Sequence, residues 1–305
     1  MYYQLKTYGV IKGERAMNTD SFKKIKYVLW IILFANIFVA LLKLVIGILI
    51  KSSSMTADGF HSLTDGSSNI VGLIGITLAS KPIDREHPYG HRKFETLCGL
   101  FIAAMLFFIG GKIIIDAINR FITPITPSIT IESLVTLVIT LGINIFVSTY
   151  EYKKGRELNS FILISDSMHT RSDIFVSVGV LFTLICIKLG LPAIIDPIAS
   201  LVVSCFIIHA AIEILKSAGN ILVDHAVIDT DKIKKIALEF NDVKGVHKIR
   251  SRGSEDDMYI DMHILTEPHM SVERSHSLIH AIEEKMKDEI NKNLQVIIHI
   301  EPYYE

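Results

Sequence analysis

The sequence is poor in cysteine and has almost no net charge. Its three cysteines, Cys98, Cys186 and Cys205, lie in apolar runs, and no two of them form a C-x-x-C pair. Such a set cannot build a disulfide framework or a thiolate zinc finger. Lys and Arg number 31 against 32 Asp and Glu, for a net charge of -1. Without a basic field to attract phosphates, the sequence does not indicate a nucleic-acid-binding protein.

Several catalytic signatures are also missing. There is no G-x-x-x-x-G-K-[ST] phosphate loop and no D-K-T-G-T phosphorylation motif, so nothing indicates that ATP drives a reaction. The H-E-x-x-H motif of zinc proteases and the G-x-S-x-G motif of serine hydrolases are absent as well. We therefore expect that the protein is not an enzyme.

What the sequence does have is apolar length. Hydrophobic residues make up 50% of the chain and charged residues 21%, and the mean hydropathy is +0.42. A bilayer core of about 30 Å is crossed by about 20 helical residues. Long apolar runs occur near residues 28–50, 55–79, 100–119, 129–149, 160–191 and 194–215. The runs near 55–79 and 160–191 have polar first halves. These runs predict a six-helix, all-α transmembrane bundle over residues 27–215, preceded by a cytoplasmic N-terminal segment, 1–26.

The composition turns soluble after residue 216. The segments that follow have the patterns of a helix, two strands, a second helix and a last strand: DTDKIKKIALEF, GVHKIRSRG, DMYIDMHILTE, SVERSHSLIHAIEEKMKDEI and LQVIIHIEP. This α-β-β-α-β order predicts a small two-layer α+β domain over residues 216–305.

The distribution of basic residues predicts the orientation of the bundle. Lys and Arg cluster before the first span, between the second and third spans, and between the fourth and fifth. The other three loops carry one basic residue each, at Lys51, Arg120 and Lys188. By the positive-inside rule both termini are expected in the cytoplasm of a multi-pass cell-membrane protein.

Two of the predicted membrane helices carry the same polar motif. Asp58–Asp65 and Asp166–Asp173 both follow D-x-x-H-x-x-x-D, which places the three side chains of each motif on one helical face. A carboxylate at mid-membrane costs about 2.5–3.5 kcal/mol on insertion scales, so a compensating ligand is expected. The alternative is that these groups line a water-filled cavity or bond between helices, but the duplication favours a metal site. Two imidazoles and two carboxylates suit tetrahedral Zn²⁺, and the candidate ligands are His61, Asp65, His169 and Asp173. The first Asp of each motif either supports these ligands or lies at the entrance of the site.

Two further groups of candidate ligands lie outside the spans. The loop between the second and third spans contains Asp84, His87 and His91, which Pro88 and Gly90 allow to converge; the alternative is a solvated loop with scattered histidines. The soluble domain contains a second group, for which the alternative is ordinary surface residues. Its members are His247, His263, His276, His299 and Glu301.

Over about residues 20–305 the chain resembles the cation diffusion facilitator family of divalent-metal transporters. The resemblance rests on ADGFHSLTDGSSN, KPIDREHPYGHRKFE and SDSMHTRSD, together with the soluble α+β domain. It implies that His61, Asp65, His169 and Asp173 form the transport site, as in the zinc-transporting branch. It also implies a loop metal site and, in a metallochaperone-like cytoplasmic domain, a binuclear site at the interface of a homodimer.

These observations together predict export of Zn²⁺ from the cytoplasm in exchange for protons. Metal binding requires neutral imidazole, and an unperturbed histidine titrates near pH 6.5, so protons compete with zinc at His61 and His169. Zinc would also have a structural or regulatory role in the cytoplasmic domain. The alternatives are an exporter of Fe²⁺, Mn²⁺, Co²⁺ or Cd²⁺, because such sites bind several divalent ions, and a membrane metal sensor that does not transport.

Overall fold

The computed structural model describes residues 2–49, 62–63, 66–122, 131–192, 194–254 and 257–304. The chain forms two compact units, Met1–Ala218 and Gly219–Glu305. Each unit has a hydrophobic core of its own.

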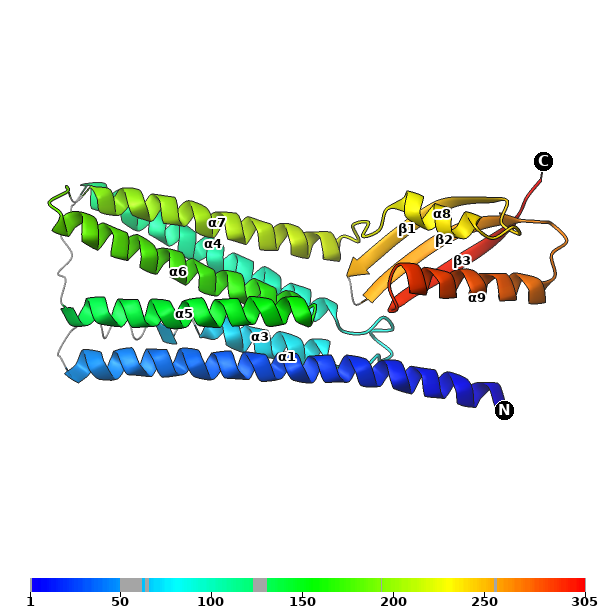
Figure 1. The fold of residues 1–305 in the computed structure, drawn as a ribbon, viewed down its shortest axis with the longest axis horizontal. Helices are drawn as coiled ribbons and strands as arrows, with labels where there is room; N and C mark the ends of the chain where they lie inside the picture. Colours follow the sequence, from blue (N-terminus) through cyan, green and yellow to red (C-terminus); the bar gives the residue numbers. More distant parts are fainter. Residues whose placement is uncertain are drawn as a thin grey trace. The chain divides into compact units, whose positions relative to one another are not determined.

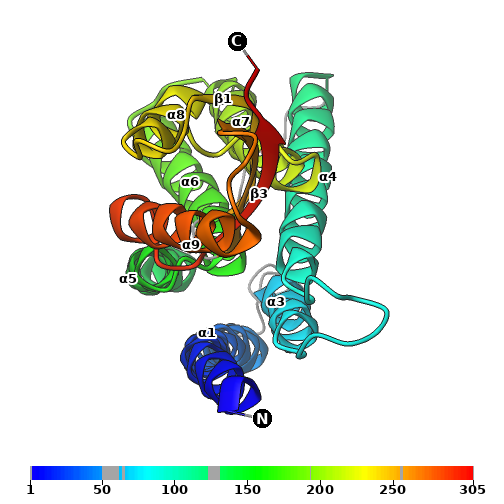
Figure 2. The ribbon, with the colours of Figure 1, turned by 90° about the vertical axis from the view of Figure 1, so that its right-hand side faces the viewer.

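The first unit is a bundle of long helices (Figure 1). α5 packs along α6, α4 contacts both α3 and α6, and α1 lies beside α3 in both views (Figures 1 and 2). The helices described in this unit are α1 (Tyr2–Leu49), α3 (Ser67–Ala79), α4 (Lys93–Ile122), α5 (Ile131–Glu157), α6 (Phe161–Lys188) and α7 (Ile195–Leu222). α1 begins far before the first apolar run, so most of the expected N-terminal segment 1–26 continues the first helix.

Four of these helices are long and apolar enough to cross a membrane within the described part of the chain. Their spans are Asp20–Ile46, Lys93–Ile122, Leu134–Glu157 and Ile195–Leu222. α6 has 28 residues, the length of a span, but contains Asp166, Arg171 and Asp173. α3 covers the apolar half of the segment expected at 55–79, and most of the polar half lies outside the described residues. A bundle of transmembrane helices followed by a small α+β domain is the fold class that the sequence predicts.

Small residues let these helices approach closely. A Cβ added at Gly75 of α3 would overlap the side chain of Cys98 on α4, and one at Gly99 of α4 would overlap Phe161 on α6. Large apolar side chains instead face outward, with Phe108 80% and Phe146 72% exposed. Small residues at helix contacts and apolar ones outside are typical of a bundle surrounded by lipid.

The second unit has the predicted α-β-β-α-β order. β1 pairs antiparallel with β2, and β2 pairs parallel with β3. Both helices start at a side-chain cap: Asp229 accepts a hydrogen bond from the Asp231 N–H at 3.0 Å, and Ser271 accepts one from the Arg274 N–H at 3.2 Å. The elements are α8 (Thr230–Leu238), β1 (Gly245–Ser254), β2 (Asp257–Thr266), α9 (Val272–Glu289) and β3 (Leu294–Pro302).

One face of this sheet packs against both helices. Alternate residues of β2 from Met258 to Ile264 are buried and join α8 and α9 in one core. The intervening residues, among them Asp261 and His263, are only half-buried because they lie on the opposite face. The helices therefore leave that second face open for polar side chains (Figure 1).

Candidate metal centres

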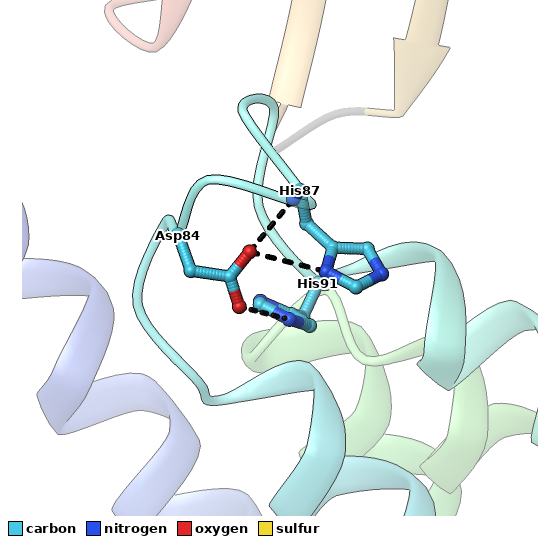
Figure 3. A group of neighbouring side chains, drawn as sticks. All are labelled: Asp84, His87 and His91. Atoms are coloured by element: carbon cyan, nitrogen blue, oxygen red, sulfur yellow. Dashed lines mark hydrogen bonds and ion pairs between the residues drawn. The ribbon is translucent and has the colours of Figure 1, made fainter.

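The first cluster lies in the loop between α3 and α4. Asp84, His87 and His91 point toward one another (Figure 3). The His91 Nε2 lies 3.3 Å from Asp84 Oδ2, the His87 Nδ1 lies 3.2 Å from Asp84 Oδ1, and the two imidazole centroids are 4.3 Å apart. One ligand atom from each residue lies within 4.8 Å of the others. Two imidazoles and a carboxylate at this spacing can hold a divalent ion, with a further position open to solvent.

The loop folds around the Asp84 carboxylate. Its Oδ1 accepts hydrogen bonds from the backbone N–H groups of His87, at 2.7 Å, and of Glu86, at 2.9 Å. Gly90 has a φ of +88°, which closes the turn and lets its N–H reach the His87 carbonyl at 3.0 Å. The backbone hydrogen bond from His87 lowers the pKa of Asp84. The carboxylate is thus kept ionised, as a metal ligand must be.

The second cluster lies on the open face of the C-terminal sheet. His247, His263 and His299 are aligned across β1, β2 and β3 because each is the strand partner of the next. The ring centroids of neighbouring histidines are 5.3 Å and 4.7 Å apart. Strand register, not sequence distance, therefore brings these three imidazoles into one row.

Glu301 ties this row together. Its Oε1 lies 2.7 Å from the His263 Nδ1 and its Oε2 lies 2.9 Å from the His247 Nε2. These three residues form the second group whose ligand atoms lie within 4.8 Å. The hydrogen bond with His263 lowers the pKa of Glu301. Since a carboxylate bridging two imidazoles is already ionised, a metal ion can replace the bridging protons.

The fourth histidine of the predicted group lies elsewhere. His276 is on α9, whose Leu278 and Ile282 pack against the covered face of the sheet, and its ring is 4.4 Å from that of His280. Within one chain it therefore does not join His247, His263 and Glu301. His299 lies beside them, with its Nε2 3.8 Å from Glu301 Oε1.

Two of the four predicted membrane ligands, His169 and Asp173, lie among the described residues. His169 is 2% exposed inside the bundle, and neither of its ring nitrogens has a hydrogen-bond partner among the described residues. Asp173 follows one turn later on the same face of α6. His61 and Asp65, and with them Asp58, lie outside the described residues, so their convergence on His169 and Asp173 stays a prediction.

A buried polar network surrounds this part of α6. The Asn69 side-chain amide on α3 donates to the Asp166 carboxylate, and Asn36 on α1 donates to the Asn69 oxygen at 2.7 Å. Arg171, a cation within a membrane helix, lies over the Tyr152 ring at 4.4 Å. Its charge is stabilised by the negative face of that ring.

One buried carboxyl in this region is not predicted by the sequence patterns. Glu151 on α5 is fully buried and is close enough to the Asp166 carboxyl to interact with it electrostatically. It follows the apolar run that ends near residue 149 and precedes Lys153 and Lys154, so composition suggests a cytoplasmic loop. Only its place on α5 beside α6 reveals it.

A small cavity lies farther along α6. It has a volume of about 140 Å³ and is lined by residues of α4, α6 and α7, including Val176, Thr183 and Asp116. Val176 and Thr183 lie three and ten residues after Asp173, on the same face of the helix. Asp196, which also lines the cavity, pairs with Arg120. The face of α6 that carries Asp173 thus also lines this cavity.

Comparison with known families covers nearly the whole chain. The family model described as the cation efflux transmembrane domain matches residues 29–223, and the one described as the cation efflux protein, cytoplasmic domain, matches residues 227–303. Their boundary lies close to the division between the two compact units.

Relatives match along most of their length. An uncharacterized transporter of Methanocaldococcus jannaschii is 32% identical over 254 residues, covering 83% of this chain and 89% of the relative. The metal tolerance protein C1 of Arabidopsis thaliana is 31% identical, covering 89% of this chain and 61% of the relative. The manganese efflux system protein MneP of Bacillus subtilis is 26% identical, covering 90% and 95% respectively.

Proposed function

Because the chain belongs to the cation diffusion facilitator family of divalent-metal efflux transporters, we propose that it exports Zn²⁺ from the cytoplasm by proton antiport. Membership makes it a multi-pass membrane transporter and not an enzyme. The proposal comprises the identity of the ion, the use of protons, the cytoplasmic position of both termini and the identity of the metal ligands.

The observation that carries the proposal is the state of His169. Among the described residues neither nitrogen of this buried imidazole has a partner, and a buried polar group without a hydrogen bond loses its hydration without compensation. A metal ion bound to one nitrogen removes part of this cost. With Asp173, and with His61 and Asp65 as the other half, the donors are two nitrogens and two carboxylate oxygens, a set typical of Zn²⁺.

Proton exchange follows from the same ligands. A histidine binds either a proton or a metal ion on a given nitrogen, so zinc release is favoured wherever the site faces a more acidic compartment. Alternating access requires only that the site open to one side at a time.

The two clusters outside the membrane helices support accessory roles for zinc. We assign Asp84, His87 and His91 to a loop site, and His247, His263, His299 and Glu301 to a cytoplasmic site. The cytoplasmic domain points to a homodimer, in which His276 would approach the sheet site only from the second protomer. Metal bound there would stabilise the dimer and report the cytoplasmic zinc level.

Manganese is the second candidate ion. MneP and MneS, two Bacillus subtilis relatives at 26% identity, are manganese efflux system proteins by name. Histidine nitrogen nevertheless suits zinc better than manganese, which prefers carboxylate, carbonyl and water oxygens. The ligand set of this chain therefore favours zinc over the ion named for those relatives.

Transport into liposomes that contain the purified protein tests the choice. We expect zinc uptake that excess Mn²⁺ inhibits weakly and that His169→Ala abolishes. Uptake of manganese in preference to zinc would refute the zinc assignment, whereas absence of transport for any divalent ion would refute the assigned site.

A further inference from the structure

A pair of buried carboxyl groups lies beside the candidate metal ligands without belonging to them. Glu151 on α5 and Asp166 on α6 are both 0% exposed. The two carboxyls are close enough to interact electrostatically. Their helices are in close contact here, because the Ser148 Oγ donates to the Ser167 carbonyl at 3.1 Å.

The hydrogen bonds of this pair are incomplete. Asn69 donates to one oxygen of Asp166, but among the described residues no donor reaches the other oxygen or either oxygen of Glu151. Two ionised carboxylates in contact offer only acceptors to each other and repel, and burial increases the repulsion. A single proton held between them supplies the missing donor and removes one negative charge.

Within the described part of the chain, the surrounding charged groups do not provide this compensation. Asp166 is the charged neighbour that acts on Glu151, while α3 has no ionisable residue between Ser67 and Ala79. Among the other ionisable groups described on neighbouring helices, three have contacts of their own and two are candidate metal ligands. Lys43 donates to Ser62 at 2.9 Å, Glu95 accepts from Ser160 at 2.5 Å and Arg171 lies over Tyr152, while the candidate ligands are His169 and Asp173.

We propose that Glu151 and Asp166 form a proton-binding site that carries a transported proton, separate from the imidazoles that bind the metal. The inference rests on the proposed antiport and names a second group that supplies its counter-ion.

The coupling is electrostatic. Asp166 precedes His169 by three residues, about one helical turn, so an arriving divalent cation is close to the pair. The cation favours the doubly ionised pair, and one proton leaves: the O–H bond breaks and both electrons stay on the carboxylate oxygen. When the cation departs, the pair takes up one proton from the side to which the site is then open. Metal and proton thus exchange without sharing a ligand atom.

Infrared spectroscopy on the full-length protein in detergent tests the proton directly. We expect a carbonyl stretch of a protonated carboxylic acid that disappears on zinc addition and is missing in Glu151→Gln and Asp166→Asn. Glu213→Gln, which changes an exposed carboxylate of α7, should keep it. A zinc-sensitive band that persists in both pair variants, or its absence from the parent protein, would overturn the proposal.

Flux measurements separate this inference from the proposed function. In liposomes, a pH gradient should stimulate zinc transport by the parent protein and by Glu213→Gln. Glu151→Gln should lose part of the stimulation while still binding zinc, because Gln can donate to Asp166 but cannot release a proton, whereas the histidine ligands still exchange protons. Stimulation equal to that of the parent protein in Glu151→Gln would overturn the proton site alone. No stimulation in the parent protein would overturn antiport itself, and the infrared band would then decide whether the pair holds a proton.

Discussion

His169 and Asp173 are the residues on which transport depends in this account. Both lie on one face of α6, and His169 has no hydrogen-bond partner among the described residues although it is buried. A buried site of this kind binds its ligand strongly, because the ligand supplies a partner to polar groups that have lost their hydration. Changes at these positions should therefore affect metal binding more than folding.

We expect Asp173→Ala to abolish zinc flux while the protein stays folded. Removal of a carboxylate from the membrane interior relieves a cost of up to about 3.5 kcal/mol on insertion scales, so the stability should be retained. Liposome flux and the thermal midpoint in detergent, measured on the same preparation, check this. Flux at the parental rate would show that Asp173 is not a ligand.

His169→Asp should shift selectivity toward Mn²⁺. The exchange of an imidazole nitrogen for a carboxylate oxygen makes the donor set harder, which disfavours zinc relative to manganese. Competition between the two ions for transport, compared with the parent protein, gives the result. An unchanged competition profile would indicate that selectivity is determined away from the membrane ligands.

Single-residue patterns predict some of these groups and miss others. The repeated D-x-x-H-x-x-x-D spacing predicts that His169 and Asp173 are ligands, because helical periodicity is local; that assignment stays a prediction. The Glu151–Asp166 pair cannot be found that way, since it arises where two helices pack. Similarly, Arg171 has no counter-charge in the sequence pattern, and its stacking on Tyr152 depends on the same α5–α6 contact.

At the scale of elements, Gly99 allows α4 and α6 to approach each other closely. A Cβ at Gly99 would overlap the Phe161 ring, so the helices could not keep their separation. Gly111, on the same helix, has no atom within 4 Å of an added Cβ. The two glycines are thus a matched pair, one at a close contact and one in open space.

We expect Gly99→Ala to destabilise the bundle by about 1–3 kcal/mol, the usual cost of overpacking. Gly111→Ala should leave stability unchanged or raise it slightly, because alanine favours the helix. Unfolding in a denaturing detergent, followed by circular dichroism, compares the two. Equal stability of both variants would mean that the α4–α6 contact adjusts without cost.

Element order was easier to predict than element extent. The α-β-β-α-β order follows from local signals such as the caps Asp229 and Ser271 and the alternation along β2. The start of α1 at Tyr2 has no such signal, because the residues before the first apolar run contain no stop. The row His247–His263–His299 depends on strand register, including a shift between His247 and Arg250, which spacing alone does not determine.

At the scale of the whole molecule, two units with separate cores carry separate candidate metal sites. Zinc bound only by the folded C-terminal unit, residues 219–305, should stabilise that fragment by about 2.7 kcal/mol at a hundredfold excess over the dissociation constant. Differential scanning calorimetry measures this. His269→Ala, which removes an exposed histidine outside the cluster, should keep the zinc effect, whereas Glu301→Gln should reduce it. Equal effects in both variants would contradict the assigned ligands.

The same fragment without metal should lose stability in acid through Glu301. Hydrogen bonding with His263 lowers the pKa of Glu301 in the folded fragment. The contribution of Glu301 to stability is therefore complete above the pKa that Glu301 has in the unfolded chain. That contribution is lost as the pH falls through the lower folded value. Thermal midpoints recorded against pH should therefore decline less steeply in that acid range for Glu301→Gln than for the parent. Parallel curves would show that the Glu301 pairing does not contribute.

Coupled movement of zinc and protons is the central claim, and one recording tests it most directly. Liposomes containing the full-length protein, with a pH-sensitive dye inside and no initial pH difference, are given zinc outside. The account predicts that zinc entry drives protons out, so that the lumen becomes alkaline, and that Asp173→Ala shows neither change. Zinc entry with a constant lumenal pH would contradict it.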